Sequence, residues 1–277
     1  MIGILRATVR LTALVGLTLA LLPAHALATS PVARRRIVRA WHRGALRIVG
    51  LKLRVRGVPA QDRGTLIVAN HISYLDICAL GASLESKFVA KAAVGAWPII
   101  GPLARRVGTL LVEREGSQCP AQIDAVTRIL EDGETAIVFP EGTSSLGKAV
   151  LPFKSTLFEA ALRADAQVQP VSIAYAKDKA GQSLMVDDCT LHPFVGDQEL
   201  APHLWRVLQH PGATADLVFH RPQRASTFTS RKALSQHCQE ECSRGLVMAR
   251  RRTFPWSGAP ETVLPQDWTN QPALAIF

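Results

Sequence analysis

The chain has 277 residues, of which 48% are hydrophobic and 19% are charged, and its formal net charge is +10. This length allows one domain with a substantial core plus an appendage. The apolar content exceeds that of a typical soluble enzyme but argues against a protein with many membrane spans.

The positive charge is concentrated near the N-terminus. Eleven Lys and Arg residues and no acidic residue precede Asp62, whereas the rest of the chain carries 21 basic and 22 acidic residues. A nucleic-acid-binding protein would carry its basic surplus on the folded body, and a basic segment beside an apolar stretch is typical of a protein at an anionic membrane. We therefore expect a membrane bilayer as a partner and no nucleic acid.

Residues 11–28 form an almost wholly apolar run, broken by Pro23 and His25. A helix that crosses a bilayer needs roughly 20 such residues. A partly inserted hairpin and a cleaved signal peptide are the alternatives, and small residues recur in a cleavage-like pattern at 24–28. The arginines that follow resist translocation and favour a retained anchor: Arg34, Arg35, Arg36, Arg39, Arg43 and Arg47. We expect the protein at the cell inner membrane, with the rest of the chain on the cytoplasmic side.

The next segment predicts an amphipathic helix. Apolar residues recur at helical spacing from Ile37 to Ile48 and include Trp41, while arginines stand four residues apart at 35, 39, 43 and 47. Such a helix suits the lipid headgroup region, and the pattern equally suits an ordinary surface helix packed on the domain. The sequence leaves both interpretations open.

The five cysteines are an odd number and are widely scattered, which suits a reducing compartment better than a disulfide framework. His237, Cys238 and Cys242 lie close together in the sequence but lack the second Cys pair of a typical zinc site. We therefore expect no bound metal.

The body of the chain alternates short strands and helices. Strands are expected at 51–55, 65–69, 87–90, 109–112, 135–139, 168–174 and 215–219, and helices at 73–84, 97–107, 121–131, 154–164, 202–208 and 231–248. This alternation predicts a single layered α/β domain over residues 51–250, with a mixed sheet flanked by helices. A hydrophobic anchor and basic helix (1–50) precede it, and an irregular tail (251–277) follows.

The first candidate site lies at 70–76, between the strand 65–69 and a helix. His71 and Asp76 are five residues apart, a spacing that a turn and the start of a helix can close. Imidazole can remove a hydroxyl proton near neutral pH, and a carboxylate on its other nitrogen holds the tautomer and stabilises the imidazolium. The pair alone is a weak signal, because a structural histidine beside a capping aspartate has the same pattern.

Two further strands end at candidate binding residues. The strand 135–139 leads into Pro140, Glu141, Gly142 and Thr143, which places a carboxylate and backbone N–H groups where ligands bind α/β sheets. A simple turn is the alternative. The strand 109–112 delivers Arg114 just past its end, where a guanidinium can bind a phosphate or carboxylate or form a surface salt bridge.

Taken in order, these segments are more specific than any one of them. Asn-His-x₄-Asp at 70–76, Gly-x₅-Arg at 108–114, Phe-Pro-Glu-Gly-Thr at 139–143 and a strand containing Pro170 resemble the glycerolipid acyltransferase family, typified by 1-acylglycerol-3-phosphate acyltransferases. The resemblance covers residues 41–220. Pro170 begins or interrupts the strand that ends at Ala174, and the alternative is that it merely marks an edge strand.

The resemblance implies a function and roles for individual residues. It implies transfer of a fatty acyl group from acyl-ACP or acyl-CoA to the hydroxyl of a lysolipid, without a metal or prosthetic group. His71 and Asp76 would be the catalytic pair. Arg114, Glu141, Gly142 and Thr143 would hold the polar head of the acceptor.

One departure from the family pattern concerns the acceptor. Members that form phosphatidic acid usually carry Arg after Phe-Pro-Glu-Gly-Thr, whereas this chain has Ser144. A hydroxyl is a weaker phosphate ligand than a guanidinium, although Lys154 can replace the missing charge. The segments 142–147, 151–155, 196–197 and 202–205 resemble instead the lyso-ornithine lipid acyltransferase branch, which acylates the 3-hydroxyl of an amide-linked hydroxy-fatty acid. We therefore expect lyso-ornithine lipid as the acceptor, with lysophosphatidate as the alternative.

Two other classes of protein account for fewer features. A serine hydrolase also uses His and Asp on an α/β sheet, but its Gly-x-Ser-x-Gly nucleophile elbow does not occur in this sequence. A non-catalytic peripheral lipid-binding protein would not need His71 and Asp76 together.

Overall fold

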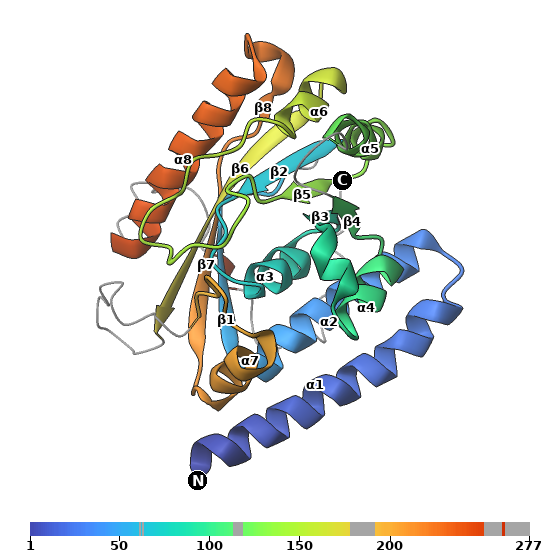
Figure 1. Ribbon diagram of the computed structural model, residues 1–277, viewed down its shortest axis with the longest axis vertical. Coiled ribbons are helices and arrows are strands. Elements are labelled where there is room, and N and C mark those ends of the chain that lie inside the picture. Colours follow the sequence, from blue (N-terminus) through green and yellow to red (C-terminus); the bar gives the residue numbers. More distant parts are fainter. Residues whose placement is uncertain (61, 63, 113–118, 178–191, 252–261, 264–277) are drawn as a thin grey trace.

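The computed structural model describes residues 1–60, 62, 64–112, 119–177, 192–251 and 262–263. Within these residues the chain forms one sheet in the order β4-β3-β5-β2-β6-β7-β1-β9, with β8 paired to β6 (Figure 1). Its strands are β1 (Leu51–Arg56), β2 (Thr65–Ala69), β3 (Lys87–Lys91), β4 (Leu110–Val112), β5 (Ala136–Val138), β6 (Gln167–Lys177), β7 (Ala213–Phe219), β8 (Gln223–Arg224) and β9 (Thr262–Val263).

The helices are α1 (Ile2–Leu27), α2 (Pro31–Val49), α3 (Leu75–Ser83), α4 (Ile100–Arg106), α5 (Cys119–Glu131), α6 (Phe158–Arg163), α7 (Leu200–Gln209) and α8 (Arg231–Arg251), with short 3-10 turns η1 (Ala92–Ala96) and η3 (Ala225–Thr227). Strands β4, β3, β5, β2 and β6 are parallel, whereas β7 runs antiparallel to β6 and parallel to β1. The predicted mixed α/β sheet with flanking helices is confirmed.

Helices cover both faces of the sheet. Successive residues of a strand point to opposite faces, and in β2 Ile67 and Ala69 pack with α2, α3 and α7, whereas Leu66 and Val68 pack with α5, α6 and α8. Two apolar layers therefore bury β2 completely. The carboxyl end of this rigid strand is the point from which residue 70 departs.

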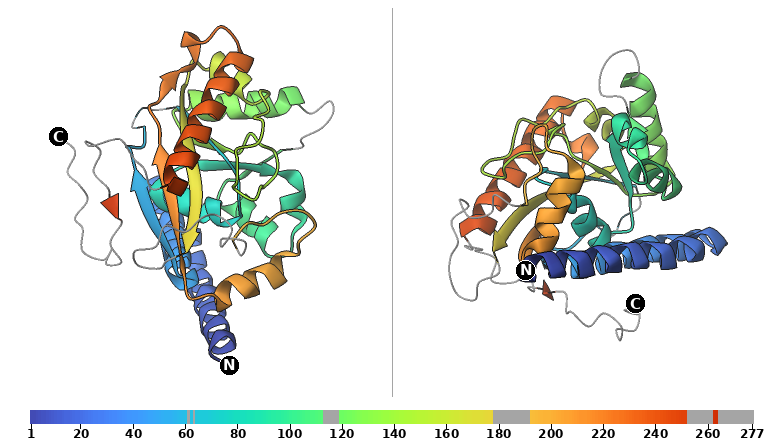
Figure 2. Two further views of the ribbon diagram at one scale, coloured as in Figure 1. Left: turned by 90° about the vertical axis from the view of Figure 1, so that its left-hand side faces the viewer. Right: turned by 60° about the horizontal axis from the view of Figure 1, so that its bottom comes forward.

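Helix α1 is the expected hydrophobic N-terminal helix. It is long and apolar enough to cross a membrane. It lies on the outside of the molecule (Figure 2), and most of its apolar side chains are exposed. Arg6 donates to the carbonyl of Gln209, and Arg10 donates to those of Leu208 and His210. These cations bind the C-terminal end of α7, where carbonyl groups lack helical partners.

Helix α2 packs on the body of the domain through a buried face formed by His42, Ala45, Leu46 and Val49. Its arginines turn toward the C-terminal end of α3. Arg39 and Arg43 both donate to the carbonyl of Ala82. The structure supports the interpretation of this segment as a helix packed on the domain, because part of its basic stripe binds protein carbonyls.

Pro170 lies in an inner strand, so its interpretation as an edge-strand residue is wrong. Strand β6 pairs with β2 on one side and with β7 and β8 on the other. The Pro170 carbonyl accepts a hydrogen bond from the His220 N–H, in the gap between the end of β7 and the start of β8. The proline nitrogen faces the same gap, so no ladder bond needs its missing N–H.

Two other segments differ from the sequence-based expectation. Helix α6 begins at Phe158 rather than at 154, because Lys154 donates its N–H to Pro140 O and Phe153 donates to the side chain of Gln239. These long-range bonds hold the preceding residues outside the helix. Thr262 and Val263, in the tail for which we expected irregular structure, pair with β1.

Candidate active site

The turn after β2 is tied to the sheet by a buried asparagine. Asn70 donates through Nδ2 to the Ile173 carbonyl (3.0 Å) and accepts from the Ile173 N–H (2.7 Å). Through these two bonds the Asn70 side chain pairs with the backbone of β6, much as a neighbouring strand would. It sets the direction in which the chain leaves β2 and enters α3.

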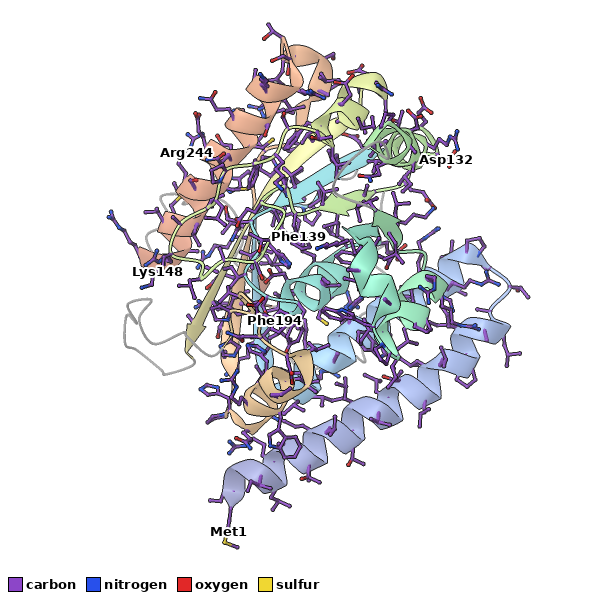
Figure 3. The ribbon with its side chains drawn as sticks, viewed as in Figure 1. Met1, Asp132, Phe139, Lys148, Phe194 and Arg244 are labelled. Atoms are coloured by element: carbon purple, nitrogen blue, oxygen red, sulfur yellow. The ribbon has the colours of Figure 1, made fainter. Side chains whose placement is uncertain are left out.

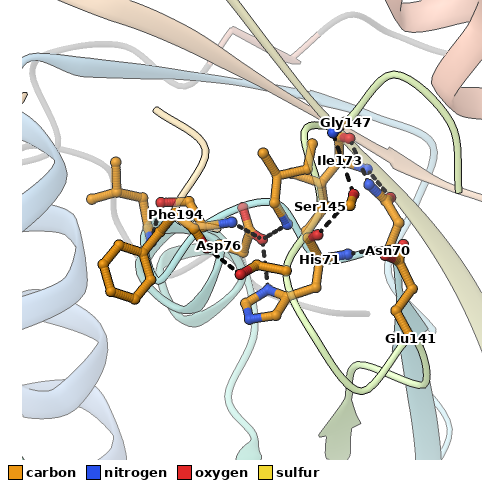
Figure 4. A network of polar contacts seen from close by, with 12 residues as sticks. Asn70, His71, Asp76, Glu141, Ser145, Gly147, Ile173 and Phe194 are labelled. Atoms are coloured by element: carbon orange, nitrogen blue, oxygen red, sulfur yellow. Dashed lines mark hydrogen bonds and ion pairs between the residues drawn. The ribbon is translucent and has the colours of Figure 1, made fainter. Parts of the chain in front are cut away.

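Asp76, in the first turn of α3, is fully buried and closes this turn (Figure 4). Its Oδ2 accepts hydrogen bonds from the N–H groups of Ile72 (2.7 Å) and Ser73 (2.9 Å), and it lies 2.9 Å from His71 Nδ1. A buried carboxylate is tolerated because these donors replace water. The structure thus brings together the two residues that the sequence predicts as the catalytic pair.

The contact with Asp76 determines the tautomer of His71. A carboxylate accepts hydrogen bonds, so Nδ1 carries the proton and Nε2 keeps a lone pair. The imidazole stacks on Phe139, with ring centroids 4.1 Å apart, and 19% of the side chain is exposed. His71 is therefore held rigidly on one side and open on the other.

Tyr175 is a member of this network that the sequence analysis missed. Its hydroxyl donates to the second oxygen of Asp76, Oδ1, at 2.5 Å, across a separation of 99 positions. Burial and the nearby Asp76 charge raise the pKa of Tyr175 well above its usual value, so the hydroxyl keeps its proton. The only signal in the sequence was a hydroxyl-bearing ring just after the expected strand 168–174.

The loop after β5 holds the main chain of His71. Glu141 Oε1 accepts from the His71 N–H (3.3 Å), and the Ser145 N–H donates to the His71 carbonyl (2.8 Å). Gly142 turns the loop with a φ of 78°, which side-chain-bearing residues rarely adopt. A Cβ atom at this position would lie 3.1 Å from Lys154 Nζ, so the lysine lies directly against the turn.

Glu141 is buried and contacts the main chain of His71. Burial raises its pKa to about 7, although hydrogen bonds from the backbone N–H groups of His71 and Leu151 favour the charged form. Its second oxygen, Oε2, has no hydrogen-bond partner in the described part of the chain. Thr143, by contrast, is exposed on the same loop.

Ser144, the residue that departs from the family pattern, is bonded to protein. Its hydroxyl donates to the Phe194 carbonyl, and the Phe194 N–H donates to Ile72 O at 2.9 Å. Phe194 packs edge-on against Tyr74 and His203. Phe139 and Phe194 both lie near the middle of the molecule (Figure 3), and the Phe139 ring stacks on His71.

The predicted binding residue Arg114 lies outside the described residues, just beyond the end of β4 at Val112. Glu141, Gly142 and Thr143 lie on the loop that contacts His71. Of the six residues predicted for the site, all except Arg114 therefore lie at one edge of the sheet in the described part of the chain.

A second histidine cluster has the composition of a hydrolase triad. Ser172 Oγ lies 2.8 Å from His220 Nε2, and His220 Nδ1 lies 3.3 Å from Glu241. Ser172 is fully buried and donates its proton to the Cys242 carbonyl, so it cannot act as a nucleophile. Within the described ranges, no group of three His, Cys, Asp or Glu side chains is arranged to hold a metal ion.

Comparison with known proteins identifies the family. Residues 52–174 match the family model described as Acyltransferase. A lyso-ornithine lipid O-acyltransferase from Rhodobacter capsulatus is 39% identical over 210 residues, which cover 74% of this chain and 73% of the relative. This chain belongs to the glycerolipid acyltransferase family. The family suggested by the ordered motifs is confirmed, and the protein is an acyltransferase.

Other relatives of the acyltransferase have a different acceptor in their names. A 1-acyl-sn-glycerol-3-phosphate acyltransferase from Neisseria gonorrhoeae is 34% identical, with 76% of this chain and 80% of the relative covered. The crystal structure of PlsC, a 1-acyl-sn-glycerophosphate acyltransferase from Thermotoga maritima, superposes with a TM-score of 0.65 at 23% identity, covering 92% and 97% of the two chains. This last likeness establishes the shared fold.

Tyr175→Phe removes one donor from the buried Asp76 carboxylate. An unsatisfied buried acceptor costs about 1–3 kcal/mol, so we expect a lower melting temperature and acyl transfer reduced by roughly tenfold, since 1.4 kcal/mol corresponds to a factor of ten. The matched control is Tyr74→Phe, because the Tyr74 hydroxyl bonds His203 rather than His71 or Asp76, the two residues of the dyad. Equal loss of activity in the two variants would contradict a specific role for Tyr175.

Glu141→Gln tests the raised pKa of Glu141. Below its ordinary pKa of 4.5 the carboxyl is protonated in both folded and unfolded chains, whereas above about 7 it is ionised in both. Between these values the folded protein retains a proton that the unfolded chain has lost, so stability falls as pH rises. We expect wild type to lose melting temperature relative to the variant between pH 5 and 8. A constant difference across this range would show that burial does not perturb Glu141.

Proposed function

We propose that the protein is a lysolipid O-acyltransferase that transfers a fatty acyl group from acyl-ACP or acyl-CoA to lyso-ornithine lipid, with His71 as general base. The observation that carries the proposal is the 2.9 Å contact between His71 Nδ1 and the buried Asp76. Among the described residues no protein group bonds His71 Nε2, so this nitrogen is available to the acceptor hydroxyl.

The reaction follows from this geometry. His71 Nε2 takes the proton of the acceptor hydroxyl as its oxygen attacks the thioester carbonyl carbon. Collapse of the tetrahedral intermediate breaks the carbon–sulfur bond, and the imidazolium returns the proton to the departing thiolate. Asp76 stays ionised and stabilises the imidazolium. These steps need no metal ion or prosthetic group.

The loop at 141–143 and Arg114 are proposed to hold the polar head of the acceptor. Support for the loop comes from its bond to the His71 main chain and from the partnerless Oε2 of Glu141. Lys154 lies against Gly142 and supplies a cation on this loop. An acceptor with a carboxylate or a phosphate can use that charge, so the lysine is compatible with both candidate lipids.

The choice of lyso-ornithine lipid rests on two observations. Relatives with this activity in their names are among the most similar proteins, and position 144 carries a serine whose hydroxyl bonds Phe194 O. A serine engaged in this way does not provide the guanidinium expected for a phosphate headgroup. Lysophosphatidate is the second candidate, because relatives named for that acceptor are nearly as similar.

The membrane location is part of the proposal. Helix α1 exposes apolar side chains along most of its length, and we propose that it anchors the protein in the inner membrane with the catalytic domain on the cytoplasmic side. Such an anchor places the dyad close to acceptors that reside in the bilayer. Cleavage after residue 28 would remove Arg6 and Arg10, which bind the end of α7.

His71→Ala is expected to abolish acyl transfer, with a loss of at least 10²-fold, because a positioned base contributes about 10²–10⁴ in rate. Membrane association should remain near wild type. Ser172→Ala is the matched control, since it alters the other Ser–His–carboxylate cluster, and it should retain activity per folded molecule. Full activity of the His71 variant would refute the mechanism, and lipid binding without measurable turnover in wild type would favour a lipid-binding protein.

Purified protein supplied with labelled acyl-ACP should acylate lyso-ornithine lipid faster than lysophosphatidate. The same pair of acceptors assayed with acyl-CoA determines the donor. We expect the preference for lyso-ornithine lipid to exceed tenfold, because Ser144 stands where the phosphatidic-acid-forming members carry the arginine expected for a phosphate headgroup. A faster reaction with lysophosphatidate would assign the protein to the phosphatidic-acid-forming branch.

A further inference from the structure

A cavity of about 570 Å³ lies at the opposite edge of the sheet from His71 and Asp76. Its floor includes Lys87, Thr109 and Thr135, which stand at the N-terminal ends of β3, β4 and β5. The dyad follows the carboxyl end of β2, and β2 is parallel to β5. The other wall of the cavity is α2 and the turn that joins it to α1. The cavity is therefore separate from the proposed catalytic site.

Cations exceed anions around this cavity. Two of its acidic side chains are already paired, Glu85 with Arg35 and Arg39, and Glu134 with Lys87. Asp132 is the remaining acid of the lining. The positive charge that no acidic side chain neutralises belongs to two arginines near the turn between α1 and α2.

Arg34 and Arg106 supply this uncompensated charge. Neither forms an ion pair with any residue in the described ranges, and His25 interacts electrostatically with both. Arg34 Nε donates to the Ala28 carbonyl at 2.8 Å, which fixes the guanidinium, and its terminal nitrogens have no partner among the described residues. The lining therefore holds two guanidinium groups and an imidazole against one remaining acid, Asp132, and guanidinium and imidazole N–H groups are donors that suit an oxyanion.

A buried histidine, His42, also lines the cavity. It is 7% exposed, and its Nδ1, which is closed to solvent, has no hydrogen-bond partner among the described residues. Buried polar atoms in folded proteins almost always have a partner, so this nitrogen is an exception. The ring packs tightly on Gly81, where a Cβ atom would lie 2.4 Å from His42 Cδ2. Its position is thus set by close packing.

We propose that this cavity binds a phosphate group through Arg34 and Arg106, with His25 and His42 as neighbouring imidazoles. Guanidinium groups bind phosphate through paired hydrogen bonds. A membrane phospholipid can present such a group, because the cavity borders the end of the apolar helix α1. A free phosphate ester has the same chemistry, and the two sources are distinguished by experiment.

The first experiment measures thermal unfolding of the full chain in detergent, with inorganic phosphate against chloride at equal ionic strength. Wild type should gain a few degrees from phosphate, by preferential binding to the folded state. Arg34→Gln and Arg106→Gln should lose at least half of this gain. Arg36→Gln is the matched control, because it makes the same charge change in α2 outside the cavity lining, and it should keep the gain. Equal gains in all four proteins would overturn the proposal.

His42→Phe separates binding from folding. Replacement of an unpartnered buried nitrogen by an apolar ring should leave the melting temperature in chloride unchanged or higher, while the gain from phosphate shrinks. Acyl transfer between detergent-solubilised substrates should stay near wild type in every variant, because none of these residues contacts the dyad. An undiminished phosphate gain in His42→Phe would remove this residue from the site.

The second experiment identifies the source of the phosphate. Sedimentation is measured with vesicles of phosphatidylcholine alone and with vesicles that contain phosphatidylcholine and phosphatidylglycerol in equal parts. A several-fold loss of binding to the mixed vesicles in Arg34→Gln, but not in Arg36→Gln, supports a lipid headgroup. Unchanged vesicle binding together with a lost phosphate gain supports a free phosphate ester.

Discussion

The structure of the site depends on one buried carboxylate, that of Asp76. It accepts hydrogen bonds from two backbone N–H groups, from the His71 imidazole and from the Tyr175 hydroxyl. The backbone donors close the turn between β2 and α3, and the imidazole contact leaves Nε2 facing outward. A single charged group therefore folds the local chain and orients the proposed base. Because a buried charge without these donors would be very costly, local structure and catalytic geometry are maintained by the same bonds.

The remainder of the site follows from parallel strands that end at one edge of the sheet. Strands β2 and β5 are parallel neighbours, so the loops at 70–76 and 139–145 leave the sheet side by side. Glu141 and Ser145 bond the His71 main chain from the second loop. Each of the two turns has an ordinary structural explanation by itself. The contact between them holds both in one rigid arrangement. It also places a carboxyl group with a raised pKa beside the proposed base.

Arginines help to join the N-terminal helices to the body, in addition to the buried face of α2. Arg10 binds the end of α7, and Arg39 and Arg43 bind the end of α3. Cations at helix C-termini interact favourably with the helix dipole, so these residues give α1 and α2 a defined position while the apolar side of α1 stays exposed. Among the described residues, Arg34 in the first turn of α2 has no carboxylate partner.

The sequence by itself determined the features that arise from local patterns. Alternating apolar strands and helices predicted the layered sheet, the apolar run predicted α1, and the five-residue spacing of His71 and Asp76 predicted a contact that one turn can close. Arg114 lies outside the described residues, and its role stays a prediction. Tertiary structure alone decided the partners that lie far away in the chain. Tyr175 reaches Asp76 across 99 positions, Pro140 and Gln239 shorten α6, and the gap between β7 and β8 accommodates Pro170. Such contacts depend on strand order and register, which hydrophobic periodicity does not encode because many sheet topologies bury the same apolar faces.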